Sequence, residues 1–447
     1  MWFNLAHVCR KWRAVMFASV SRLNLGITVG PIKPAHIKTI LSGPFPFLLD
    51  YKLMPAQKIT ASALWRMRTV LKHHDRVRGI AFACDPEAAA GRVDKFFKAA
   101  NCSFPVLESL VIHFTVGHPE IPETFLRGPD LSSLHLRRLE LICASFSSIS
   151  KFLSSTSPSL TNLLINIAPI SSASTLLACL QGMSCLRSLD LSISSSSQPI
   201  NYPPTSSHSI PKATVSLSRL TRFCYSGHSV LLNAIVAGIS APSLRDVSIE
   251  FHDLILLSHY AIPSIVVHFF RFFSEVEEDY HTLHLDFLED TRMLEWDFRL
   301  SLFTHSESIG RCKPRFELGP CLSRSSETII RMSDVLSTKL TNVEELRVTF
   351  GSMKPVDEGT RIPWHDFYRK LPCVKTLRIE ESKSSYFIAR TLLNQEPNLP
   401  FFPSLEEIDL GTTPFYESQR ISQLAAFQPF VNARQQVGCP VKVFFSQ

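Results

Sequence analysis

The residues best suited to chemistry in this sequence are two histidines, His281 and His284, that follow a short acidic run. Histidine nitrogens and carboxylate oxygens are common metal ligands, so a divalent-metal site is the chemistry to consider. The nearby carboxylates are those of Glu277, Glu278, Asp279 and Asp286. Residues 280–287 alternate in the manner of a strand, and two strand positions three apart face opposite sides of a sheet. The pattern therefore favours solvated strand and loop residues over a metal site.

Other catalytic signatures do not occur in the sequence. It contains no G-x-x-x-x-G-K-[ST], no G-x-G-x-x-G and no G-x-S-x-G. Its 11 cysteines are scattered and form no C-x-x-C pair, which is typical of reduced core cysteines in a protein of the cytoplasm or nucleus. We therefore expect no enzyme activity, no catalytic residues, no bound metal and no cofactor.

The formal net charge of +7 is concentrated near the start of the chain, because residues 1–100 hold sixteen Lys and Arg against five Asp and Glu. A basic segment can indicate a nucleic-acid partner, but no basic run exceeds two residues, which favours a solvated basic face. The most apolar stretch, residues 254–273, contains Pro263 and His268. We expect a buried helix there and no membrane partner.

A short pattern recurs along the chain: a small residue or proline, then Leu-x-x-Leu-x-apolar. Its nine anchor positions are Leu107, Leu136, Leu160, Leu186, Leu220, Leu244, Val343, Val374 and Leu405. Successive anchors lie 24 to 34 residues apart, except for a gap of 99 residues between Leu244 and Val343, where we expect further degenerate units such as 280–287. The alternating apolar residues after each anchor predict a short strand with one buried face.

Segments with apolar residues at helical spacing lie between the anchors, at 176–180, 231–239, 329–336 and 364–371. Strand, helix and strand in this order indicate parallel strands joined by right-handed crossovers. We therefore expect an α/β fold over residues 26–447, a degenerate leucine-rich-repeat-like solenoid with its parallel sheet on the concave face and helices outside. A Ser/Pro-rich loop is expected at 192–213. The alternative is an irregular α/β domain with several strands of similar composition.

The first helix carries one apolar stripe and a tryptophan. The segment "LAHVCRKWRAVMFAS", followed by "RLNL", resembles the C-terminal half of an F-box, in which a Val-Cys-Arg-x-Trp-Arg helix closes a three-helix domain. The match is carried by Val8, Cys9, Arg10, Trp12 and Arg13, with Leu5 and Val15 as apolar flanks. An F-box followed by these repeats is the arrangement of F-box/leucine-rich-repeat proteins.

The resemblance covers about residues 2–20, within a partial F-box at 1–25, because the family's opening Leu-Pro-x-Glu segment has no counterpart. It implies a non-catalytic substrate-recognition subunit of an SCF-type cullin-RING ubiquitin ligase. The implied partners are a Skp-type adaptor with its cullin-RING complex, which the first helix would bind, and an unknown protein substrate. The alternative is a repeat-based interaction scaffold without a ubiquitin role.

The substrate should bind the concave face of the predicted sheet. The residues that flank the second leucine of each strand point to that face, since side chains alternate along a strand. The candidate substrate contacts are Asp190, Arg222, Asp246, Glu345, Arg347, Arg378, Glu407 and Asp409. Their mixed charges favour a protein partner over a nucleic acid.

Overall fold

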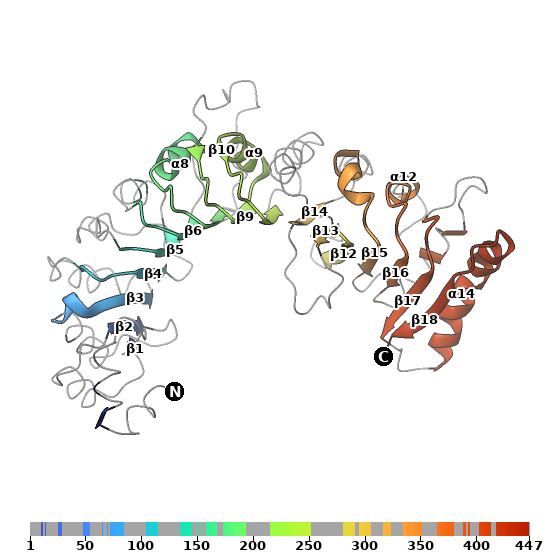
Figure 1. Ribbon diagram of the computed structural model, residues 1–447, viewed down its shortest axis with the longest axis horizontal. Helices are drawn as coiled ribbons and strands as arrows, with labels where there is room; N and C mark the ends of the chain where they lie inside the picture. Colours follow the sequence, from blue (N-terminus) through green and yellow to red (C-terminus); the bar gives the residue numbers. More distant parts are fainter. Residues whose placement is uncertain are drawn as a thin grey trace. The chain divides into compact units, whose positions relative to one another are not determined.

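The computed structural model describes a set of segments distributed along the chain. They are residues 10–11, 14, 26–28, 48–53, 65, 69, 72–84, 104–114, 135–144, 150, 153, 158–167, 173–193, 215–251, 280–290, 295–304, 316–322, 334–350, 364–379, 388–389, 392–393, 402–412 and 417–446. The chain forms two compact units (Figure 1). Unit 1 comprises Met1–Leu220 and Gly238–Ala241, and unit 2 comprises Thr221–Ala237 and Pro242–Gln447.

Unit 1 contains seven parallel strands that lie side by side in chain order. They are β1 (Gly26–Thr28), β2 (Leu48–Leu53), β3 (Val77–Cys84), β4 (Ser109–Phe114), β5 (Arg138–Ala144), β6 (Asn162–Ile167) and β7 (Ser188–Ile193). The short helix η1 (His74–Arg76) precedes β3, and α8 (Ala173–Leu180) connects β6 to β7. A separate parallel pair joins β8 (Val215–Ser216) to β10 (Ile239–Ser240).

Unit 2 contains a mostly parallel sheet in the order β9-β11-β14-β13-β12-β15-β16-β17-β18. Its strands are β9 (Arg222–Gly227), β11 (Asp246–Phe251), β12 (Thr282–Asp290), β13 (Glu295–Phe303), β14 (Phe316–Leu322), β15 (Glu345–Phe350), β16 (Thr376–Ile379), β17 (Glu407–Thr412) and β18 (Lys442–Ser446). Its helices are α9 (Ser229–Ala237), α12 (Trp364–Tyr368) and α14 (Glu417–Gln436), and residues 334–340 are also helical. The mixed α/β class with parallel strands is thus confirmed.

The sequence pattern led us to expect further parallel units in the long gap between Leu244 and Val343. The gap holds an antiparallel strand as well. Strand β13 is antiparallel to both of its neighbours, β12 and β14. Only residues 291–294 connect β12 to β13. A parallel connection needs a dozen or more residues, so this short link requires a hairpin. Strand β14 then pairs in parallel with β11, and β12 pairs in parallel with β15.

Each repeated unit, here called a rung, consists of a strand and the turn that precedes it. In the turn, the N–H of the anchor residue donates to the carbonyl three residues earlier, as from Leu186 to Met183 at 3.1 Å and from Leu405 to Phe402 at 3.0 Å. The same bond joins Leu107 to Phe104, Leu220 to Leu217, Val343 to Leu340 and Val374 to Leu371. Both ends of the turn are buried apolar residues, so the turn satisfies backbone groups that have no access to water.

A second backbone contact links each rung to the next. The carbonyl of the residue after the anchor accepts two N–H groups from the following rung, as Thr161 does from Arg187 at 2.8 Å and Ser188 at 3.0 Å. The carbonyls of Glu108, Arg137, Thr221, Glu344 and Lys375 accept in the same way, and so does that of His281, which follows Tyr280 before β12. These shared carbonyls fix the register between neighbouring rungs.

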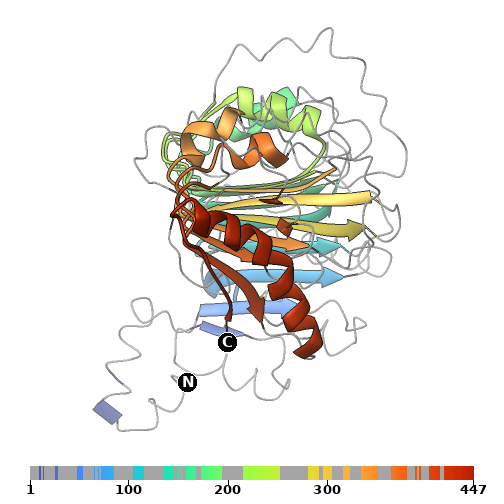
Figure 2. The ribbon, with the colours of Figure 1, turned by 90° about the vertical axis from the view of Figure 1, so that its right-hand side faces the viewer.

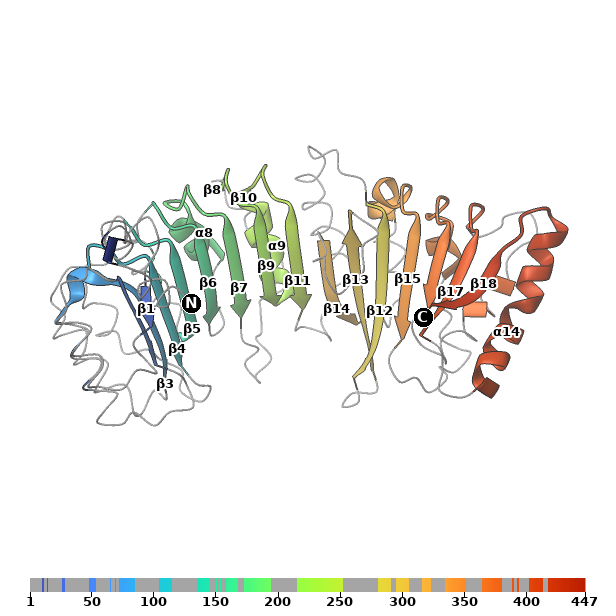
Figure 3. The same ribbon diagram turned by 60° about the horizontal axis from the view of Figure 1, so that its bottom comes forward.

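The core of each unit lies on one side of its sheet. All nine anchors are buried, and residues alternate between buried and half-buried along β7, as the sequence pattern predicts. Figure 3 shows α8 behind the strands of unit 1 and α9 behind those of unit 2. In Figure 2, α14 is the dark red helix at the front, and it packs beside β18 of unit 2.

Two sequence expectations fall partly or wholly outside the described residues. The first two residues of the loop predicted at 192–213 belong to β7, which extends to Ile193, and residues 194–214 are not described. The apolar stretch 254–273 also lies outside the described residues. Among the helices that are described, none has the length and apolar character needed to cross a membrane.

Candidate functional site on the sheet of unit 2

Two rows of polar side chains cross the strands of unit 2. Strand pairing aligns Thr282, Glu345, Thr376 and Glu407 in one row, and His284, Arg347, Arg378 and Asp409 in the other. The intervening residues, including Leu346 and Leu377, are buried in the core. Because side chains alternate along a strand, both rows lie on the face opposite the core.

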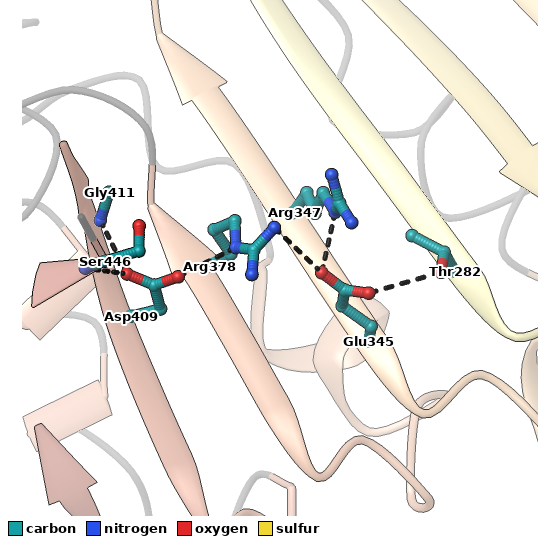
Figure 4. Close-up of polar contacts among 7 residues, drawn as sticks. All are labelled: Thr282, Glu345, Arg347, Arg378, Asp409, Gly411 and Ser446. Atoms are coloured by element: carbon teal, nitrogen blue, oxygen red, sulfur yellow. Dashed lines mark hydrogen bonds and ion pairs between the residues drawn. The ribbon is translucent and has the colours of Figure 1, made fainter. Parts of the chain in front are cut away.

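Four charged side chains in these rows form a chain of contacts, which we call the polar network (Figure 4). Arg347 donates from Nε to Glu345 Oε1 at 2.7 Å. Arg378 donates from Nε to Asp409 Oδ2 at 2.9 Å, and its Nη1 lies 3.6 Å from Glu345 Oε1. The hydroxyl of Thr282 donates to Glu345 Oε2 at 3.4 Å. Positive and negative groups therefore alternate along the network, and its formal charge is zero.

Both carboxylate oxygens of Asp409 accept hydrogen bonds from within the chain. Besides Arg378, its carboxylate accepts the N–H of Gly411 and the N–H of Ser446, both on Oδ1 at 3.0 Å. These bonds occur where the register between β17 and β18 shifts, and Gly411 has φ +69°, a conformation that favours glycine. The Asp409 carboxylate thus takes over hydrogen bonds that the interrupted ladder leaves open, and it holds β18 to the sheet.

Burial separates the candidate contacts of the network into two groups. The side chains of Glu345, Arg347 and Asp409 are 8%, 4% and 1% exposed, whereas that of Arg378 is 32% exposed. We expected all four to contact a substrate. In the structure Asp409 bonds within the chain, as expected for a buried charge, which is stable only when it is paired. Arg378 is the member that reaches the surface.

The other four predicted contacts lie on their strands as the alternation requires. Asp190 in β7, Asp246 in β11 and Glu407 in β17 are half-buried, and Arg222 in β9 is exposed. Arg222 and Asp246 occupy paired positions in unit 2. Glu407 lies 3.9 Å from Lys442 of β18, a surface ion pair.

Sequence reasoning missed a smaller polar cluster in unit 1. Glu140 of β5 accepts a hydrogen bond from Arg138 Nε at 2.7 Å, and His113 Nε2 of β4 lies 3.4 Å from Glu140 Oε2. Arg138 and Glu140 flank the second leucine of their rung, Leu139. The rule that selected the other candidates would therefore have found them.

An ion pair between neighbouring rungs lies at the exposed start of β15 and β16. Lys375 Nζ donates to Glu344 Oε1 at 2.7 Å. This hydrogen bond, and the charge of Lys375, lower the pKa of Glu344, and the same contact raises the pKa of Lys375.

His281 and His284 have separate surroundings. His284 Nε2 lies 2.8 Å from Thr349 Oγ1, and the backbone of His281 takes part in the contact between rungs. Within the described residues, no three His, Cys, Asp or Glu side chains are grouped as metal ligands. Glu277, Glu278 and Asp279 lie outside the described residues, and the side chain of Asp286 is also not described.

Most of the F-box-like helix is not described. Arg10 is helical and exposed, whereas Leu5, Val8, Cys9, Trp12, Arg13 and Val15 lie outside the described residues. Comparison with known proteins finds no protein-family model that matches the chain and no curated protein that is similar to it.

Proposed function

We propose that this chain is a non-catalytic substrate-recognition subunit of an SCF-type cullin-RING ubiquitin ligase. In this proposal the strands of each unit belong to a leucine-rich-repeat-like solenoid, and the first helix is the closing helix of an F-box. The observation that carries the recognition role is the repeated rung, with its buried turn and shared carbonyl. Arrays of such units are built to present an extended face to another protein.

The face of the sheet that carries the polar rows supports this role. Figure 3 shows α8 and α9 behind the strands of their units. In unit 2 the polar rows lie on the face away from the core, where Arg378 and Glu407 are part-exposed. A face of mixed charge, with some residues paired internally and others half-exposed, suits a protein partner.

The ligase part of the proposal is supported by the motif formed by Val8, Cys9, Arg10, Trp12 and Arg13. An adaptor bound to this helix would hold the captured substrate near a ubiquitin-loaded enzyme. No chemistry by this chain is required, because tethering raises the effective concentration of the substrate lysine at the reacting thioester.

A repeat scaffold without a ubiquitin role is the second candidate. The observation in its favour is that the rungs, on which the recognition role rests, are held together without the F-box-like helix. In a scaffold this helix would only pack against a neighbouring rung.

Co-purification with a Skp-type adaptor distinguishes the two candidates. The full chain should retain the adaptor, and Trp12→Ala should lose it. Trp65→Ala is the matched control, because Trp65 is an exposed tryptophan outside the motif. If the unmodified chain does not bind the adaptor, or if Trp12→Ala binds it equally well, the ligase role is rejected in favour of the scaffold.

A further inference from the structure

Two arginine side chains lie next to each other at the centre of the polar network. Arg347 and Arg378 are paired positions of β15 and β16, so they project from the same face. Each is held by its Nε atom, Arg347 by Glu345 and Arg378 by Asp409. Figure 4 shows the terminal nitrogens of Arg347 directed away from Glu345.

The terminal nitrogens of these arginines are largely unused. Within the described part of the chain, no acceptor contacts Nη1 or Nη2 of Arg347, or Nη2 of Arg378. Only 4% of the Arg347 side chain is exposed, yet its terminal nitrogens are not among the fully buried polar atoms that lack a partner. These donors can therefore take an acceptor that comes from outside the strands.

The shape of the guanidinium group indicates which acceptor fits. Its donors form a planar fork that matches the two oxygens of a carboxylate. The Nε contacts with Glu345 and Asp409 fix the orientation of both forks in advance. Arg378 is a third exposed, so an incoming group can reach it.

We infer that Arg347 and Arg378 form a recognition site for carboxylate side chains in an acidic segment of the protein partner. This inference rests on the proposed recognition of a protein, and it adds the chemical class of the segment recognised. Because Glu345 and Asp409 balance the two arginines, the empty site has no net charge. Binding then depends on paired hydrogen bonds more than on long-range attraction, and its salt dependence is weak.

Fluorescence anisotropy on the full chain tests the site with a labelled hexaglutamate peptide and a hexaglutamine peptide of the same length. Hexaglutamate should bind and hexaglutamine should not. Arg378→Met should weaken hexaglutamate binding by about tenfold or more, because a charge-assisted bidentate contact is lost. Arg245→Met is the matched control, since it removes an exposed arginine from another strand connection of unit 2, and its effect should stay within about twofold.

Arg378→Lys keeps the charge beside Asp409 and the fold while it removes the fork. It should also weaken binding, which separates loss of recognition from loss of structure. Equal binding of the two peptides, or unchanged hexaglutamate affinity in both Arg378 variants, would overturn the site. A phosphoserine peptide that binds tenfold more tightly than hexaglutamate would overturn the assignment to carboxylates. Adaptor co-purification depends on Trp12 and not on these peptides, so the two proposals fail independently.

Discussion

Replacement of Asp409 gives the most informative test of the polar network. Asp409→Ala removes an almost fully buried carboxylate together with its contacts to Arg378, Gly411 and Ser446. Arg378 is 32% exposed and keeps Glu345 at 3.6 Å, so the main loss is at the two backbone N–H groups, each of which costs about 1–3 kcal/mol when it is left without its acceptor. We expect the free energy of unfolding to fall by about 4 kcal/mol, measured by guanidinium denaturation followed by circular dichroism.

The two carboxylate oxygens of Asp409 have different partners, and this separates their contributions. Oδ1 accepts both backbone N–H groups and Oδ2 accepts Arg378. Asp409→Asn can keep the first oxygen but places an NH₂ group opposite the Arg378 donor. We expect a loss of about 2 kcal/mol, in line with one charged hydrogen bond. Arg378→Met should relieve the donor–donor conflict, so the double variant should be more stable than the sum of the single effects predicts.

The control for this series is Glu407→Gln, on the same strand. Glu407 is half-buried and its partner Lys442 is 3.9 Å away, so the change should cost less than about 0.5 kcal/mol. Amide exchange at Ser446 gives an independent readout, and it should accelerate in Asp409→Ala and not in the control. If Asp409→Ala costs less than about 1 kcal/mol and exchange at Ser446 is unchanged, Asp409 does not hold β18.

Two further predictions test the rung architecture. Leu163 and Leu164 are neighbours in β6 but lie on opposite faces of the sheet. Leu163→Ala should therefore lower the free energy of unfolding by about 3 kcal/mol, and Leu164→Ala by less than about 1 kcal/mol. Similar losses in the two variants would show that the alternation of faces is wrong. Lys375→Met should raise the pKa of Glu344 toward its ordinary value, as followed by carboxyl NMR titration. Since Lys375 lowers the folded-state pKa of Glu344, the stabilisation from this pair is present above the unfolded-state pKa and is lost as the pH falls through the folded-state pKa. An unchanged titration in the variant would mean that the pair does not persist in solution.

The sequence by itself determined the strands that carry a repeated anchor. The leucine pattern located β4–β7, β9, β11, β12 and β15–β17, because burial of alternate residues imposes a period of two that is visible in the chain. The same alternation placed Arg347 and Arg378 on the outer face. Periodicity is a local property, so it needs no knowledge of which strands become neighbours.

The tertiary structure decided the features that depend on which strands lie side by side. The antiparallel strand β13 has no anchor, and its direction follows from the short link at 291–294. The sequence also assigned the same role to Arg378 and Asp409, both charged residues beside a buried leucine or isoleucine. Only the pairing of β16, β17 and β18 brings Arg378 and Ser446 to the Asp409 carboxylate, to which Gly411 of the same strand also donates. Whether a charged side chain is bound within the fold depends on the donors around it, and two of the donors to Asp409 come from positions 31 and 37 residues away in the chain.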